Sequence, residues 1–239
     1  MKLKKIASLM LAGIMAVSML AGCAGKPVDD NKDDDNTGNN TVSYSSMLAQ
    51  NIDEKVKKDY IHFEDKASDA VALTDALGNL GWVVTNAGAT LPMTPVHLNQ
   101  CLTQNKIACF SGVTSMIDDF EKSIDAANWD LDYCGAKDRL VTWPWTIGED
   151  ETMVCGLVYV VDGTVDINKA MAHVGADVEA LLRDVKNTNN CQDCCPTTVY
   201  NYDYTVSASV VNKPVDVIDW YHGSANFIAV TITRVPTAA

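Results

Sequence analysis

The sequence predicts an α+β domain in which N-terminal helices pack on a mostly antiparallel or mixed β-sheet of about four to six strands. Two patterns carry this prediction. In the first half of the chain apolar residues recur at three- and four-residue spacing, as in amphipathic helices, whereas the second half contains an apolar run and a segment that alternates with period two, as in strands. With 239 residues and 47% hydrophobic composition, the chain is long enough for one domain with a sizeable core.

Four helices are expected in the first half and one in the second. Thr94-Pro95, a capping hydroxyl followed by proline, predicts the start of the third helix, and Asp166 predicts the N-cap of the fifth. The fifth helix carries an unbroken apolar stripe and is the strongest of the set. The expected helices span residues 45–60, 68–78, 94–105, 114–128 and 167–186.

The strands are expected after residue 150. Residues 152–161 are apolar on both faces, which predicts an interior strand, whereas residues 199–211 alternate and predict a strand with one wet face. Pro214 is expected to begin a short helix or turn that ends at Tyr221. The final strand is expected over 225–235, with shorter ones at 82–85, 107–110 and 139–142.

The N-terminus has the features of an export signal. Lys2, Lys4 and Lys5 form a basic head, and the apolar run that follows ends in Leu20-Ala21-Gly22-Cys23. This ending resembles the lipobox of bacterial lipoproteins, in which a small-residue pair precedes a cysteine that is acylated, for example with palmitate, and becomes the mature N-terminus. The resemblance implies that Cys23 carries lipid and anchors the protein to the cell membrane, facing the extracytoplasmic side.

The polar segment after the signal predicts a tether. Residues 26–41 are dominated by Asp and Asn and have too few apolar side chains to form a core. The expected organisation is a signal peptide over 1–22, a lipidated cysteine and disordered acidic tether over 23–41, and one extracytoplasmic domain over 42–239. The formal net charge of −13 argues against nucleic acid as a partner.

Seven cysteines beyond Cys23 favour disulfide bridges, because thiols outside the membrane tend to oxidise. Seven is odd, so at least one must be unpaired or bonded to another molecule. A short Cys101–Cys109 loop is favoured, with the clustered cysteines joined to distant positions such as Cys134 or Cys155. A redox pair requires its first cysteine at the N-terminus of a helix, whereas this cluster follows an expected helix and leads into an expected strand. A zinc site lacks a fourth ligand beyond the three clustered sulfurs. The candidates are Cys101, Cys109, Cys134, Cys155, Cys191, Cys194 and Cys195.

Two histidines have an acidic or thiol neighbour at helical spacing. His97 and Cys101 lie four apart on the expected third helix, the geometry of a Cys-His nucleophile, although no carboxylate that would orient the histidine is identifiable. His173 and Asp177 repeat the spacing and are expected to form a solvated ion pair.

Paired aromatic residues near turns are the candidate binding surface. Trp143 and Trp145 flank Pro144, and Trp220 precedes Tyr221. Such side chains stack on sugars or anchor protein partners, and they are also ordinary core material. Because no catalytic motif, metal site or cofactor site is found, the sequence predicts a non-enzymatic lipoprotein that binds a glycan or a protein at the cell surface. The alternative is a small extracytoplasmic thiol enzyme or hydrolase that uses Cys101 with His97.

Overall fold

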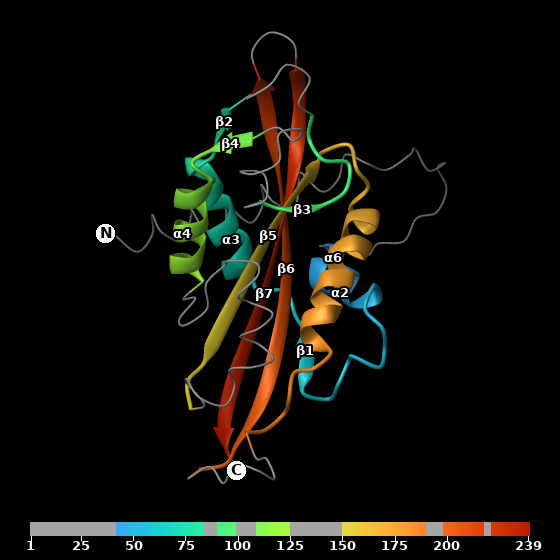
Figure 1. Cartoon of the computed structure of the whole chain (residues 1–239), viewed down its shortest axis with the longest axis vertical. Helices are drawn as coiled ribbons and strands as arrows, with labels where there is room; N and C mark the ends of the chain where they lie inside the picture. Colours follow the sequence, from blue (N-terminus) through green and yellow to red (C-terminus); the bar gives the residue numbers. More distant parts are fainter. Residues whose placement is uncertain (1–41, 84–89, 99–108, 125–149, 190–197, 218–220) are drawn as a thin grey trace, which may run out of the picture. The chain divides into compact units, whose positions relative to one another are not determined.

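A computed structural model describes residues 42–83, 90–98, 109–124, 150–189, 198–217 and 221–239 of the chain. Residues 44–239 form a compact unit built on a mixed sheet with the strand order β1-β6-β7-β5-β3 (Figure 1). β1 runs parallel to β6, and the other neighbouring strands are antiparallel. The expected α+β class and mixed sheet are confirmed. The strands are β1 (Ile61–Phe63), β3 (Val96–His97), β5 (Met153–Asp162), β6 (Tyr200–Val217) and β7 (Tyr221–Ala238).

Helices cover both faces of this sheet (Figure 1). α2 (Tyr44–Gln50) and α6 (Ile167–Leu182) pack on one face, and the core between them and the sheet is called the α2/α6 core. α3 (Ala67–Ala76), the 3-10 helix η1 (Leu77–Asn79) and α4 (Val113–Ser123) pack on the other, and their core is called the α3/α4 core. β2 (Gly81–Val83) and β4 (Cys109–Ser111) form a separate antiparallel pair close to the positions expected for two short strands.

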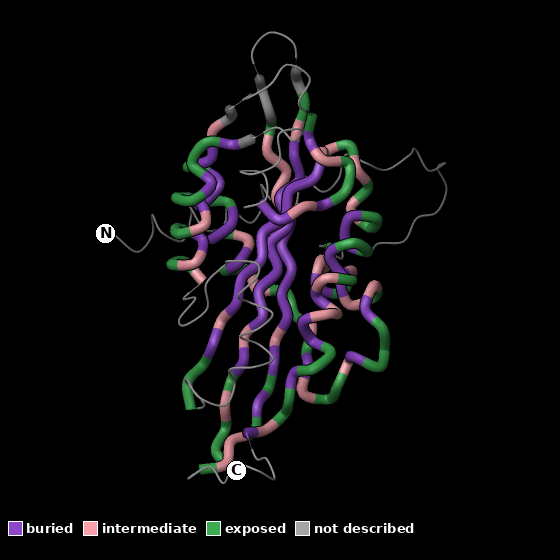
Figure 2. Tube along the Cα trace, viewed as in Figure 1, coloured by how far each residue is buried: buried purple, intermediate pink, exposed green. Residues whose placement is uncertain are grey.

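β6 and β7 form a long hairpin at the centre of the unit. They pair without interruption from Tyr200–Ala238 to Val217–Tyr221, and β5 pairs with the other edge of β7. Because side chains alternate along a strand, β7 contributes Ile228 to the α2/α6 core and Phe227 to the α3/α4 core. Figure 2 shows the buried residues concentrated along these central strands.

The fifth expected helix is confirmed as α6. Asp166 caps it, because its carboxylate accepts a hydrogen bond from the Lys169 N–H at 3.2 Å. The apolar stripe is buried in the α2/α6 core. Gly175 lies in this stripe where the chain after α2 crosses the helix, and a Cβ there would lie 3.0 Å from the Asn51 carbonyl oxygen.

The first expected helix is too long. α2 ends at Gln50, and the chain then turns, because the Asp53 side chain accepts a hydrogen bond from the Lys55 N–H at 2.9 Å. Ile52 and Val56 are nevertheless buried in the α2/α6 core. Their spacing therefore predicted correctly that they are buried, but wrongly that they lie in a helix. The second helix is confirmed as α3, although Val71, assigned to the apolar face, is 52% exposed. The fourth is confirmed as α4, and residues 125–128 of its expected range lie outside the described residues.

The expected third helix is wrong where the structure describes it. Val96 and His97 form the edge strand β3, which pairs with Val160 and Tyr159 of β5. The residue before a proline is biased towards extended backbone, so Thr94-Pro95 also suits the entry to a strand. Residues 99–105 and the strand expected over 139–142 lie outside the described residues.

Pro214 lies within β6 and does not begin a helix. Tyr202, Tyr204 and Ala208 donate their N–H groups away from β7, to Asn187 O, Tyr60 O and Ser45 Oγ. The register is continuous, so residue 214 also directs its nitrogen away from β7. Proline therefore removes no hydrogen bond from the hairpin, and β6 continues to Val217.

The expected wet face of β6 is partly buried. The tyrosine face packs in the α2/α6 core as predicted, but Ser207 and Ser209 on the opposite face are also buried. The reason is tertiary, because α3 packs against β6. The alternation predicted the strand correctly and could not show which helix would cover its polar face.

Candidate functional site

Most of the predicted site residues lie outside the part of the chain that the structure describes. Tyr221 and Cys109 are placed by their backbone at the starts of β7 and β4. His97 and Cys155 have described side chains. The residues outside the described ranges are Cys23, Cys101, Cys134, Trp143, Trp145, Cys191, Cys194, Cys195 and Trp220.

Cys155 is a free thiol in the structure. Its side chain projects from β5 into the α2/α6 core and is 1% exposed. Burial removes the solvent that would stabilise a thiolate and, with a smaller contribution from the Glu121 carboxylate, raises the pKa of Cys155 to about 12. The expectation that Cys155 forms a disulfide with a distant cysteine is not supported, and the thiol is unsuited to nucleophilic chemistry.

His97 contacts a carboxylate that sequence spacing did not identify. Its Nε2 lies 3.6 Å from Asp177 Oδ2 of α6, and its ring centroid lies 4.2 Å from that of Tyr159 on β5. The histidine side chain is 8% exposed and the aspartate 39%. Asp177, expected to pair with His173 on its own helix, therefore faces β3.

Burial controls the protonation of His97. Desolvation lowers the pKa of this imidazole from 6.5 to about 4, against the opposing attraction of Asp177 and with a smaller repulsion from His173. The ring is therefore neutral at neutral pH. A neutral, buried imidazole at 3.6 Å from a carboxylate fills the space beneath α6 and is not positioned to take a proton from an external substrate.

A second polar cluster ties the start of α3 to the sheet. Thr231 Oγ1 on β7 donates a hydrogen bond to Asp69 Oδ2, and Ser68 Oγ donates one to Asp69 Oδ1 at 3.1 Å. Lys66 Nζ donates to Thr233 Oγ1 at 2.6 Å, and its backbone N–H donates to Ser207 Oγ at 3.1 Å. The partners on β6 and β7 lie more than 140 residues away from Lys66 and Asp69 in the sequence, so no local motif could reveal these contacts. These contacts satisfy the buried carboxylate and fix the position of α3.

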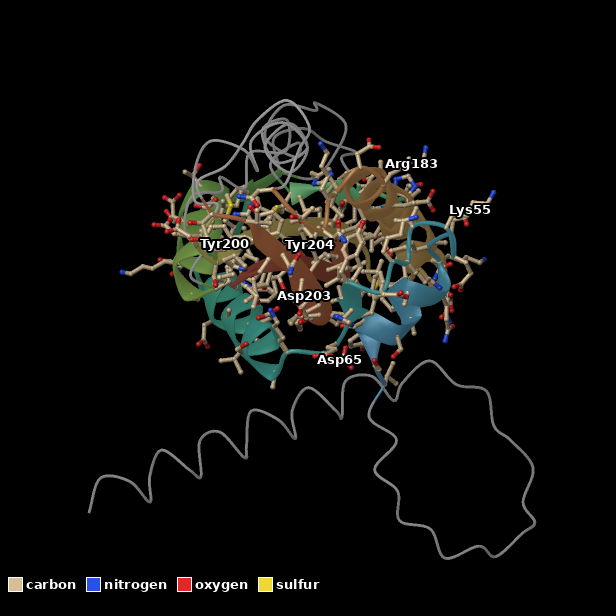
Figure 3. The ribbon with its side chains drawn as sticks, turned by 90° about the horizontal axis from the view of Figure 1, so that it is seen from below. Lys55, Asp65, Arg183, Tyr200, Asp203 and Tyr204 are labelled. Atoms are coloured by element: carbon tan, nitrogen blue, oxygen red, sulfur yellow. The ribbon has the colours of Figure 1, made fainter. Side chains whose placement is uncertain are left out.

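Two tyrosines secure the chain after α6. Tyr60 donates a hydrogen bond to Val185 O at 3.2 Å, and Tyr204 donates one to Lys186 O at 3.0 Å. Burial raises the pKa of Tyr204, which keeps its hydroxyl a donor. Figure 3 looks from below and shows Tyr204 well inside the outer rim on which Arg183 lies.

Asn189 then holds together the ends of the chain on either side of residues 190–197. Its side-chain amide donates to Thr198 O at 3.0 Å, and its Oδ1 accepts the Tyr200 N–H at 2.8 Å. Asn189 and Thr198, the described residues before and after the sequence that contains Cys191, Cys194 and Cys195, therefore lie close together at the start of β6.

Within the described ranges, no three His, Cys, Asp or Glu side chains are grouped so that they would hold a metal ion. The described helices include none with the length and apolar character needed to cross a membrane. Comparisons with protein-family models, curated proteins and solved structures find no match for the chain.

Proposed function

We propose that the protein is a non-enzymatic lipoprotein that is anchored on the extracytoplasmic side of the cell membrane and binds a glycan or a protein there. The observation that carries the anchoring is the N-terminal sequence, in which a basic head and an apolar run end in Leu20-Ala21-Gly22-Cys23. The compact unit begins at Tyr44, directly after the acidic stretch expected to be a tether. That boundary supports the division into anchor, tether and domain.

The physical basis of the anchor is acyl-chain burial. Each methylene buried in the bilayer contributes about 0.8 kcal/mol, so two or three chains on Cys23 hold a protein far more firmly than one. A flexible tether of this length gives a reach of roughly 20 Å above the lipid surface.

The burial of His97 and its position in a strand favour binding over catalysis as the function. His97, the base of the alternative thiol-enzyme hypothesis, lies in β3 under α6 with a pKa lowered to about 4. It is therefore neutral but buried, and the helical spacing that linked it to Cys101 does not apply to a strand residue. The alternative enzyme hypothesis loses its geometric argument.

The β6–β7 hairpin provides the first candidate binding surface. β5 pairs with β7 only as far as Ala225, so the hairpin extends beyond β5 to the Val217–Tyr221 pair. Trp220 belongs to the three-residue connection between these strands, and Tyr221 is the first residue of β7. Aromatic residues at the end of a paired hairpin offer large contact area at low entropic cost.

Trp143 and Trp145 form a second candidate surface, separate from Tyr221 because the chain between them and the sheet is too short to reach it. They precede Met153 by ten and eight residues, and Met153 pairs with Arg234 of β7. Tyr221 lies thirteen residues from Arg234 along β7, a distance of roughly 42 Å along a strand. The ten residues from Trp143 to Met153 span at most about 36 Å even when fully extended. This length is shorter than the distance along β7 to Tyr221.

We further propose that six of the domain cysteines form three disulfide bridges. With Cys155 free, the remaining six are an even number. Met153 follows residues 125–149 in the sequence and Tyr200 follows residues 190–197, and the register places Met153 and Tyr200 towards the same end of the sheet. This supports two bridges among Cys134, Cys191, Cys194 and Cys195, with adjacent Cys194 and Cys195 taking different partners, and a third between Cys101 and Cys109.

The anchor is tested by replacing Cys23 with Ser. The variant is expected to leave the membrane fraction, because no thiol remains to be acylated, while its domain unfolds at the same temperature as the unchanged protein. Membrane fractionation of both proteins gives the answer. A Cys23→Ser protein that stays firmly membrane-bound contradicts the proposal.

The binding surface is tested by replacing Trp220 with Ala and screening a glycan array and envelope proteins. The substitution is expected to cost on the order of 2 kcal/mol of binding, with little effect of salt and little change in melting temperature. The matched control is Phe227→Ala on the same hairpin, which removes a buried ring packed on Phe110 and is expected to cost about 3 kcal/mol of stability. A Trp220→Ala protein as destabilised as the control contradicts a binding role.

The cysteine assignment is tested by alkylation and mass spectrometry without reduction. No domain cysteine is expected to react in the folded protein, and one, Cys155, is expected to react after unfolding. Cys155→Ala serves as the control and is expected to have no reactive thiol in either state. Two or more free thiols, or Cys155 within a bridged peptide, would overturn the assignment.

A further inference from the structure

The contact between β3 and α6 places a buried titratable ring where an edge strand meets a helix. β3 is two residues long and pairs with β5 at the edge of the sheet. Val96 packs against the α3/α4 core, whereas His97 faces Asp177 of α6 on the other side. The imidazole is therefore the side chain of β3 that contacts α6.

We infer that His97 is an acid-operated latch: the neutral imidazole lies against Tyr159 and holds β3 to α6, and the protonated imidazolium leaves this position for the solvent beside Asp177. The inference concerns regulation within the fold and does not depend on the proposed binding function.

The structure shows the inner position of the His97 ring, and the exposed Asp177 carboxylate marks where the outer position is inferred to lie. The inner position is closed by the Tyr159 ring, whose centroid lies 4.2 Å away, and it leaves the His97 side chain 8% exposed. The outer position lies next to the Asp177 carboxylate, which is 39% exposed. The Nε2–Oδ2 distance of 3.6 Å is longer than a hydrogen bond, so a charged ring that moves outward gains both hydration and a closer ion pair.

The charged groups of the described chain that act on His97 come from α6. Asp177 attracts the protonated ring, and His173, one turn earlier on the helix, repels it. β5 contributes the Tyr159 ring, and β7 places the apolar Ile228 opposite that tyrosine. Desolvation outweighs these charges and lowers the pKa of His97 from 6.5 to about 4.

Acid therefore favours the open position. The ordinary pKa of histidine is 6.5, and hydration beside the Asp177 carboxylate keeps the open ring at or above this value, whereas the closed ring has a pKa of about 4. The open state therefore binds more protons as the pH falls through this interval. The opening equilibrium is expected to rise by about 100-fold between pH 7 and pH 4, because the closed ring is itself half protonated at pH 4 and the full factor of ten per pKa unit is reached only below that pH.

The opening is local because the rest of the segment is held from the opposite face. Leu91 and Leu98, on either side of β3, are buried in the α3/α4 core. β5 keeps its full pairing with β7 when β3 separates from its other edge. Acid is thus expected to release β3 before the sheet unfolds.

The test is amide hydrogen exchange between pH 7 and pH 4, corrected for the intrinsic rate at each pH, with α6 and β7 as references. In the full domain the β3 amides are expected to lose protection in acid while the reference amides keep theirs. His97→Phe keeps an aromatic ring without a titrating proton and is expected to abolish the change. Asp177→Asn removes the negative charge that attracts the protonated His97 ring, so the loss of β3 protection is expected at lower pH. His62→Gln, on the exposed side of β1, is the control and is expected to behave as the unchanged protein.

Three results would overturn the latch. They are β3 protection that is equal at pH 7 and pH 4, a full acid response in His97→Phe, and a simultaneous loss of protection in β3, α6 and β7. If His97→Phe does not fold, His97→Gln replaces it, and an NMR titration of His97 in the unchanged protein measures the pKa directly. A value at or above 6.5 also overturns the inference.

Discussion

The fold depends on β7, because this one strand supplies both hydrophobic cores. Its pairing with β6 on one edge and β5 on the other leaves no main-chain freedom along residues 225–234, so its side chains must alternate between the two cores. Ile228, Val230 and Ile232 face α2 and α6, and Phe227 and Ala229 face α3 and α4. A slip of one residue would exchange these two sets, so the register of the hairpin determines whether either layer of helices can pack.

Polar contacts then fix the helices against this apolar frame. Lys213 donates hydrogen bonds to the carbonyls of Leu77, the first residue of η1, and Leu80, which follows η1, and burial lowers the pKa of its ammonium group. Asp69 is held by Thr231 at the other end of α3. A buried carboxylate or ammonium without such partners would be destabilising, so each contact specifies position more than it adds net stability.

The sequence predicted the elements whose signal is local and long. Three patterns were each sufficient to predict an element: the apolar stripe of α6, the apolar run of β5 and the alternation of β6. In each element at least one buried face is apolar, so the spacing of apolar residues shows the type of element. The two- and three-residue strands β3 and β1 are too short to show a period. Pro214 is tolerated in β6 because its nitrogen points away from β7, and this direction follows from the strand pairing, not from the sequence around it. The His97–Asp177 contact joins residues eighty positions apart, so spacing paired each of them with a neighbour on its own segment instead.

The most direct test of the role of β7 uses two adjacent residues that face opposite cores. Ile228→Val removes a methylene from the α2/α6 core and Phe227→Leu reduces the α3/α4 core, each at a cost of about 1 kcal/mol. Native-state hydrogen exchange of α6 and α3 amides measures both sides of the sheet at once. If β7 couples the cores, each substitution lowers the opening free energy of the slowest amides of both helices by the same amount. If Phe227→Leu lowers protection in α3 alone while α6 keeps its full value, the two cores are independent and the account is contradicted.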